Sequence, residues 1–350
     1  MWKVVGRLFF FNLQWLYHQG GQLNVVKQLR GGSLSSTCVV QHASGLYVRK
    51  MSCRTNNREH GLVRLFSQKS KQNYLARIFP QYFLPVLATG MDQLTGDAYI
   101  ELEYKEGYRN LFEVLSENPP ESTVARIFML VREVIEELGS HELEGQITPQ
   151  ALDLYFEEEF IQPVAYLRGA SFHPLLEEES FTFQGRSIRN LVFQDLSSLS
   201  EHYQSESFGR ETLTHGNFTL ENILVSPNIE DIKLIDCYEE NYVSSRYNDL
   251  SQLLQCTRAF YSASVGCTKL IDCHGVSASF QVPSGILQLN EMLEAYLAQV
   301  LEVEERRLVD LYLISQFTRM LPFKMKGGDS PGALYYFALA SSLYESFISR

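Results

Sequence analysis

The chain has 350 residues, and 45% of them are apolar. This is enough for a substantial core in one large domain or two smaller ones. The formal net charge of −11 argues against nucleic-acid backbones and anionic membrane surfaces as main partners, since both are negatively charged. The six cysteines form no Cys-x-x-Cys pair, which is typical of reduced, mostly core residues in a cytoplasmic protein.

Residues 1–22 form an N-terminal extension with an aromatic run at 8–17. Asn12 and Gln14 interrupt this run, which is too short to span a bilayer, and it lacks the small-residue cleavage site of a signal peptide. One interpretation is a terminal helix or strand packed on the residues that follow. The alternatives are a peripheral membrane contact made by residues 1–17 or an oligomer contact. The oligomeric state itself cannot be read from the sequence.

Residues 23–105 predict a small, strand-rich lobe. A strand at 23–29 leads into a Gly/Ser turn, where absent or small side chains let backbone N–H groups approach phosphate oxygens. Taken alone, Gly31-Gly32 is typical of an ordinary hairpin; the alternative is a phosphate-binding turn with Gly31, Gly32, Ser33 and Ser35 as its candidate residues.

Two strands follow this turn and form a predicted hairpin. They span 38–41 and 46–51 and are joined by a turn with Gly45, a residue suited to positive φ; Lys50 lies near the end of the second strand. The lobe then continues with further elements, namely a helix at 59–79, a strand starting at 85 and a strand at 98–104.

Residues 106–350 predict a larger, mainly helical lobe. Its clearest helix, 122–139, has apolar residues at helical spacing and ends at Gly139. Further helical stretches are expected at 152–168, with Pro163 as a break or kink, and at 188–203, 250–261, 286–303, 306–320 and 330–349. The stretch 270–282 predicts a loop or a short hairpin.

The most informative segment is Leu-Thr-His-Gly-Asn-Phe-Thr-Leu-Glu-Asn at 213–222, followed by an apolar strand ending at Asp236. Hard cations prefer oxygen ligands, so Asn222 and Asp236 are candidate ligands of a divalent metal. Asp249 lies shortly afterwards and could cap a helix that starts near Leu250.

This segment resembles the catalytic loop and metal-binding strand of the aminoglycoside phosphotransferase and choline kinase group, which shares the protein-kinase fold. The group reads His-Gly-Asp, four residues, Asn, and then an apolar strand ending in Asp; His215, Gly216, Asn222 and Asp236 stand at matching places. The resemblance implies an α+β, two-lobed fold, with an antiparallel sheet in the small lobe and one kinase-like domain overall.

The resemblance also implies ATP and Mg²⁺ as cofactors and a small-molecule hydroxyl as acceptor, such as a sugar, an amino alcohol or an aminoglycoside. Lys50 would pair with the ATP phosphates, and backbone groups near Glu103 and Tyr104 would bind the adenine edge. His215 would hold the loop by hydrogen bonds, and Asp249 would brace it.

Two positions depart from the family pattern. Asn217 stands where the catalytic Asp is expected, and Gln72 stands where a helix Glu should pair with the strand lysine. An amide has no useful basicity, although its oxygen can orient a hydroxyl by accepting a hydrogen bond. The chain is therefore either a phosphotransferase with weakened activity or a pseudokinase that binds nucleotide or acts as a scaffold. A further alternative is that Glu221 or Glu239 supplies the base.

Runs of glutamate occur at 157–159, 177–179 and 302–305. They fit solvated helix faces and loops. The alternative is that acidic groups near the substrate attract a cationic acceptor.

Overall fold

The computed structural model describes residues 24–29, 35–52, 58–91, 97–170, 173–204, 208–238 and 241–349. The predicted N-terminal extension and the turn residues Gly31, Gly32 and Ser33 lie outside the described residues. The chain divides into two compact units between Glu106 and Gly107, one residue beyond the boundary that the sequence predicts.

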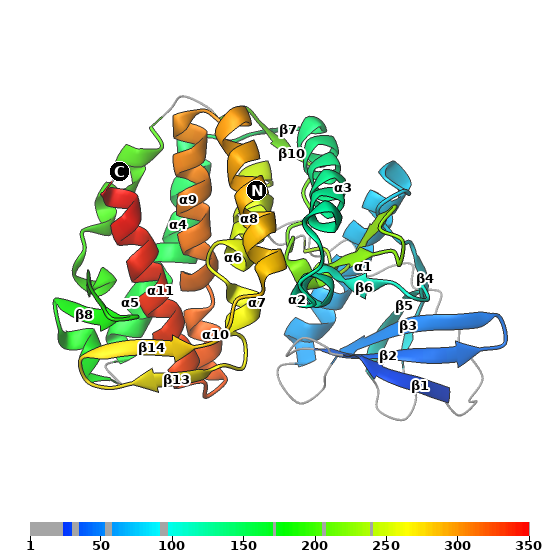
Figure 1. Ribbon diagram of the computed structural model, residues 1–350, viewed down its shortest axis with the longest axis horizontal. Coiled ribbons are helices and arrows are strands. Elements are labelled where there is room, and N and C mark those ends of the chain that lie inside the picture. Colours follow the sequence, from blue (N-terminus) through cyan, green and yellow to red (C-terminus); the bar gives the residue numbers. More distant parts are fainter. Residues whose placement is uncertain are drawn as a thin grey trace. The chain divides into compact units, whose positions relative to one another are not determined.

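The small unit contains an antiparallel five-stranded sheet, ordered β1-β2-β3-β5-β4, and one long helix (Figure 1). Ser35 does not lie in the predicted turn but begins β2, where it pairs with Ser52 of β3. The elements are β1 (Asn24–Leu29), β2 (Ser35–His42), β3 (Gly45–Ser52), α1 (Arg58–Ile78), β4 (Val86–Met91) and β5 (Ala98–Glu103).

Helix α1 covers one face of this sheet. Leu65 of α1 packs against Ile100 of β5 in the small unit's core. Side chains alternate between the two faces of a strand, and Lys50 is paired in register with Ile100. Lys50 therefore lies on the face that α1 covers, whereas Arg49 and its cross-strand partner Glu101 lie on the opposite face.

The large unit is mainly helical and also carries small sheets, ordered β10-β7, β12-β11-β6 and β13-β14-β8-β9. Its helices are α2 (Leu111–Ser116), α3 (Glu121–Ser140), α4 (Pro149–Phe156), α5 (Gln162–Ala170), α6 (Arg246–Thr257), α7 (Tyr261–Ser264), α8 (Ser284–Val300), α9 (Val303–Thr318), α10 (Leu321–Lys326) and α11 (Ser330–Ile348). Its strands are β6 (Arg109–Asn110), β7 (Glu142–Gln146), β8 (Ser180–Phe183), β9 (Arg186–Arg189), β10 (Arg210–Thr212), β11 (Ile223–Val225), β12 (Ile232–Leu234), β13 (Thr268–Ile271) and β14 (Gly275–Ser279).

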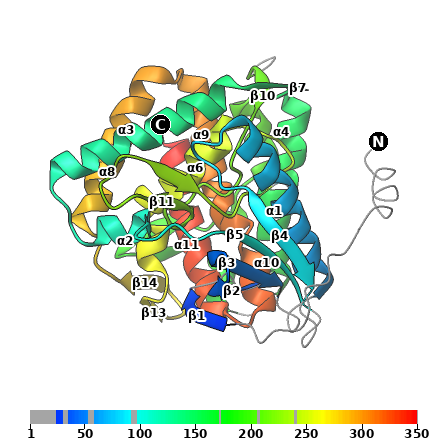
Figure 2. The same cartoon turned by 90° about the vertical axis from the view of Figure 1, so that its right-hand side faces the viewer.

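Helices α6 and α9 pack against each other at the centre of the large unit (Figure 2). Every residue of α6 from Tyr247 onward is buried, so this helix has no solvent face. The polar side chains inside pair with one another, since Gln316 Nε2 donates to Asn248 Oδ1 at 2.8 Å and to Ser251 Oγ at 3.1 Å. Because α6 is enclosed in this way, it is a rigid base for the loop that it contacts.

The predicted helix at 152–168 is interrupted in a different way from that expected. The chain stays helical across Pro163 and widens just before it into a π-helix, Glu157–Ile161. Proline has no N–H to donate to the carbonyl four residues earlier, which is that of Glu159. The hydroxyl of Thr318 donates to this carbonyl instead, at 2.6 Å.

The predicted helix at 188–203 is wrong. Residues up to Arg189 belong to strand β9, and short 3-10 turns follow at Leu191–Phe193 and Leu196–His202. A hairpin covers most of the stretch 270–282: β13 pairs with β14, and the pairing starts two residues earlier, at Thr268. Among the described residues, no helix has both the length and the apolar character needed to cross a bilayer.

Candidate catalytic loop and metal site

The loop at 215–222 and Asp236 are brought together by strands β11 and β12. These strands pair antiparallel, with Ile223 opposite Leu234. One residue further out, Ile235 N donates to the carbonyl of Asn222 at 3.1 Å. Asp236 is the next residue, so the two predicted metal ligands, Asn222 and Asp236, come from adjacent positions on neighbouring segments.

A chain of amide hydrogen bonds links these ligands through Asn217. Asn222 Nδ2 donates to the backbone carbonyl of Asn217 at 2.8 Å. Asn217 Nδ2 in turn donates to the backbone carbonyl of Asp236 at 3.1 Å. Each amide uses its Nδ2 for a hydrogen bond inside the loop. The Oδ1 of the same amide therefore points away from that bond. Within the described part of the chain, neither Oδ1 accepts a hydrogen bond.

Two residues of the site adopt the left-handed backbone conformation. Gly216 has φ of +79°, which glycine tolerates because it lacks a Cβ. Asp236 has φ of +63°, which costs a non-glycine residue about 1–3 kcal/mol. The hydrogen bonds around Asp236 must offset this strain, and the bond from Asn217 is one of them.

Asp249 braces the loop through two backbone N–H groups. Its Oδ2 accepts from His215 N at 2.6 Å, and its Oδ1 accepts from Gly216 N at 2.8 Å. The expectation that Asp249 also caps its helix is wrong. Helix α6 begins at Arg246, so Asp249 lies in its first turn, and the cap is Ser245, whose side chain accepts from Tyr247 N.

His215 is fully buried and structural. Its Nδ1 accepts a hydrogen bond from Asn217 N at 3.2 Å, so its Nε2 must carry the ring proton and donate to the Ile235 carbonyl at 2.9 Å. Its own carbonyl accepts from Tyr238 N. With both ring nitrogens occupied, this histidine ties the loop to the end of β12.

Gln252 is a contributor that the sequence motif did not reveal. Its Oε1 accepts from Phe218 N at 2.6 Å, and its Nε2 donates to the carbonyl of Gly216 at 2.9 Å. It is 1% exposed and lies three residues after Asp249, on the same side of α6. One face of α6 therefore holds the backbone on both sides of Asn217.

In the small unit, Lys50 contacts helix α1 through Gln68. Lys50 Nζ donates to Gln68 Oε1 at 2.9 Å. Gln72 lies one helical turn later, is buried, and donates its Nε2 to the Leu84 carbonyl at 2.8 Å. Because Gln68 is neutral, this contact between the lysine and α1 is a hydrogen bond to an amide.

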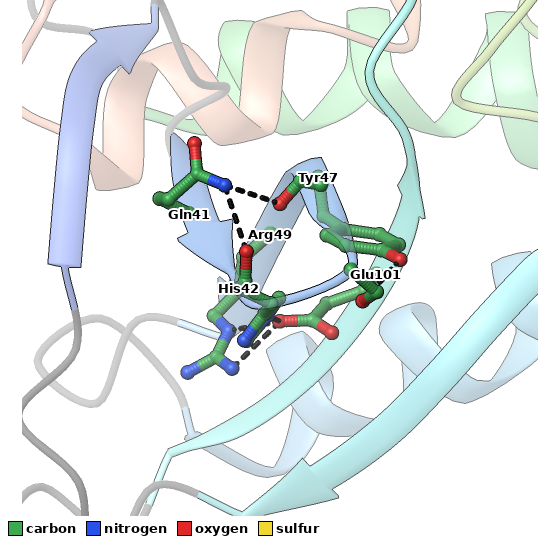
Figure 3. Close-up of polar contacts among 7 residues, drawn as sticks. Gln41, His42, Tyr47, Arg49 and Glu101 are labelled. Carbon is green, nitrogen blue, oxygen red and sulfur yellow. Dashed lines mark hydrogen bonds and ion pairs between the residues drawn. The ribbon is translucent and has the colours of Figure 1, made fainter.

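A buried ion pair fixes the strand that carries Lys50 (Figure 3). Glu101 Oε1 of β5 accepts from Arg49 Nε at 2.7 Å and lies 2.6 Å from Arg49 Nη2. His42 Nε2 lies 3.0 Å from the same oxygen, and the guanidinium stacks 3.9 Å above the Tyr99 ring. A register slip of β3 would expose this pair, so it holds the position of Lys50 from the opposite face.

The predicted adenine-binding groups are only partly available. The backbone N–H of Tyr104 donates to the Leu46 carbonyl at 3.3 Å, inside the sheet. Backbone groups alternate in direction along a strand, so those of Glu103 point away from β3. On that other side the neighbouring strand is β4. Its pairing with β5 starts at Val86, opposite Leu102, and does not extend to Glu103. The carbonyl of Glu103 is therefore the better candidate for an adenine contact.

The oxygen ligands of the large unit fit magnesium. Asn222 Oδ1 and the Asp236 carboxylate are hard donors, and nucleotide-bound Mg²⁺ usually takes one or two protein ligands together with phosphate oxygens and water. Among the described residues there is no cluster of three or more His, Cys, Asp or Glu side chains that would hold a metal by itself.

Solved structures with a similar fold include several aminoglycoside phosphotransferases. A thermostable mutant of APH(4)-Ia, in a ternary complex with AMP-PNP and hygromycin B, is 11% identical, with 94% of this chain and 95% of that chain covered and a TM-score of 0.58. Aminoglycoside 2'-phosphotransferase-IIIa, in its GDP complex, is 14% identical over 92% and 93%, with a TM-score of 0.50. A putative aminoglycoside phosphotransferase from Ralstonia eutropha is 11% identical over 94% of each chain, with a TM-score of 0.52.

No protein-family model and no curated protein matches the sequence. The structural likeness nevertheless covers nearly the whole of both chains. The chain therefore has the two-lobed α+β, protein-kinase-like fold of the aminoglycoside phosphotransferases, and this prediction is confirmed. At these identities the likeness shows the fold alone, because one fold serves many functions.

Proposed function

We propose that this chain is a phosphotransferase that moves the γ-phosphoryl group of ATP to a hydroxyl of a small molecule. The observation that carries the proposal is the hydrogen-bonded loop in which Asn222, Asn217 and Asp236 are joined and Asp249 braces the backbone. The nucleotides and the aminoglycoside in the similar structures support it.

Each residue has a role that its chemistry allows. Lys50, oriented by Gln68, attracts the phosphates. The turn that the sequence predicts around Gly31 and Gly32, which lies outside the described residues, would cover them. Asn222 Oδ1 and the Asp236 carboxylate hold Mg²⁺, which, when bound, neutralises charge that develops on the phosphoryl oxygens.

Asn217 orients the acceptor hydroxyl through its Oδ1. It cannot take up the proton, so the reaction lacks a contribution that is typically worth about a hundred- to ten-thousand-fold in rate. Slow turnover is the expected result, since positioning and electrostatic stabilisation supply most of the catalysis in phosphoryl transfer.

A pseudokinase is the second candidate, and a specific observation favours it. Asn217 stands where the resemblance places the catalytic aspartate, and the α1 residue that accepts a hydrogen bond from Lys50 is the amide Gln68. Such a protein would bind Mg²⁺ and nucleotide tightly without turnover.

The test is consumption of ATP, and of GTP in parallel, with a panel of sugars, amino alcohols and aminoglycosides. We expect slow, acceptor-dependent turnover that Asp236→Ala abolishes. The matched control is Asp272→Ala, because Asp272 is exposed in the turn between β13 and β14. Nucleotide binding without turnover would support the pseudokinase. Turnover that survives Asp236→Ala would contradict the metal assignment.

A further inference from the structure

We propose that Asn217 is a positioning residue for the metal-binding carboxylate: its side-chain amide holds the backbone of Asp236 in the conformation that presents that carboxylate. This role rests on the proposed function. It gives the amide at position 217 a purpose that an aspartate there could not serve.

The side chain of Asn217 starts from a fixed backbone. Its N–H donates to His215 Nδ1 at 3.2 Å. Its carbonyl accepts from Thr219 N at 2.9 Å and from Asn222 Nδ2 at 2.8 Å. A short side chain on a fixed backbone has few rotamers to choose from. The 3.1 Å bond from Nδ2 to the Asp236 carbonyl therefore transmits the position of the loop to the end of β12.

Asp236 depends on such an external bond because its own backbone is strained, with φ of +63°. The residue before it is held at both polar groups, since Ile235 N donates to Asn222 O and His215 Nε2 donates to Ile235 O. Tyr238, two residues after Asp236, donates its N–H to the His215 carbonyl. The bond from Asn217 adds a tether at the carbonyl of Asp236 itself.

An aspartate at position 217 would break this arrangement. An ionised carboxylate has only acceptor oxygens, and one of them would face a carbonyl oxygen at about the distance of the present bond. The two oxygens repel, so the side chain must rotate away and the Asp236 carbonyl loses the hydrogen bond from position 217. An aspartate at position 217 would therefore provide a proton acceptor but would remove the hydrogen bond to the Asp236 carbonyl.

The same tether fixes the direction of the other end of the amide. The amide group is planar, so a bond from Nδ2 also sets where Oδ1 points. Within the described residues Oδ1 accepts no hydrogen bond, which leaves it able to accept one from a substrate hydroxyl. One side chain thus positions the metal ligand and the acceptor together.

The experiment measures manganese(II) binding in the presence of ADP by electron paramagnetic resonance, because Mn²⁺ takes the oxygen ligands of Mg²⁺. The full chain is compared with Asn217→Ala and Asn217→Asp. The control is Asn118→Asp, which adds the same charge in the same unit. Among the described residues, the Asn118 side chain forms hydrogen bonds through its Oδ1, which accepts from Ser284, and an aspartate keeps that acceptor. Phosphoryl transfer and stability in urea are measured on the same samples.

We expect both Asn217 variants to bind Mn²⁺ about tenfold or more weakly, the usual effect of losing a residue that orients a metal ligand, while Asn118→Asp binds normally. A gain of turnover in Asn217→Asp with unchanged Mn²⁺ affinity would overturn the proposal. If the native chain binds no Mn²⁺ with ADP, the proposed function fails. The urea denaturation curves then test, independently of metal binding, whether Asn217 tethers Asp236. Both Asn217 variants must be less stable than Asn118→Asp, and equal stability would overturn the tether itself.

Discussion

Replacement of Gln252 by leucine tests whether helix α6 holds the loop around Asn217. The change removes the acceptor of Phe218 N and the donor to the Gly216 carbonyl. Both backbone groups are buried, and each buried polar group left unsatisfied costs about 1–3 kcal/mol. The leucine adds apolar surface to the core, which offsets part of the sum. We therefore expect the free energy of unfolding to fall by about 3 kcal/mol.

Urea denaturation of the full chain measures this change. The matched control is Gln255→Leu, because Gln255 lies one turn later on α6, is also buried at 5% exposure, and forms no hydrogen bond with the loop as described. The control should keep most of its stability. If Gln252→Leu were no more destabilising than Gln255→Leu, the loop would not depend on α6 as argued.

Three further predictions concern parts of the chain outside the loop. Glu101→Gln should lower the free energy of unfolding by about 3–5 kcal/mol, because it leaves the buried Arg49 charge unpaired; a loss below about 1 kcal/mol on thermal denaturation would show that the pair is dispensable. Thr318→Val should cost about 1–3 kcal/mol by removing the donor to the π-helix carbonyl, and an unchanged urea midpoint would contradict it. Burial and the nearby Arg307 charge lower the pKa of His202, whose Nδ1 lies 2.9 Å from that guanidinium. The folded chain therefore binds this proton less readily than the unfolded chain, so its contribution to stability is present at neutral pH and is lost as pH falls below about 6.5. His202→Gln should flatten the decline in urea stability between about pH 7 and pH 5, and an equally steep decline in the variant would refute the assignment.

The sequence predicts elements well where one physical signal dominates. The sequence predicts helix α3 (Glu121–Ser140) at 122–139, because apolar residues recur at helical spacing; five of them form its buried stripe, namely Val124, Ile127, Val131, Val134 and Leu138. The β13–β14 hairpin overlaps the stretch 270–282 that the sequence predicts as a loop or short hairpin, but it begins two residues earlier, at Thr268.

The sequence-based predictions fail in two situations. In one, neighbouring residues are equally good candidates for a contact; in the other, a residue far away in the sequence determines the local structure. Gln68 and Gln72 lie one turn apart on the same side of α1, so periodicity could not tell which one contacts Lys50. The π-helix before Pro163 depends on Thr318, which is 159 residues from the carbonyl that it satisfies.

In the candidate site too, some features could be predicted from the sequence and others could not. The spacing of the motif predicts which residues belong to the loop, and the structure shows Asp249 holding two of its N–H groups. The role of Gln252 could not be predicted, because it depends on two side-chain bonds to the backbone and not on a motif. The capping of α6 by Ser245 was missed because the helix starts four residues earlier than its apolar pattern indicates.

The most direct test of the nucleotide site is calorimetric titration of the full chain with ATP, with and without Mg²⁺. We predict binding that Mg²⁺ strengthens, and we predict that Asp236→Ala removes the Mg²⁺ dependence while Asp272→Ala leaves it intact. Absence of ATP binding under both conditions would contradict the phosphotransferase and the nucleotide-binding pseudokinase alike.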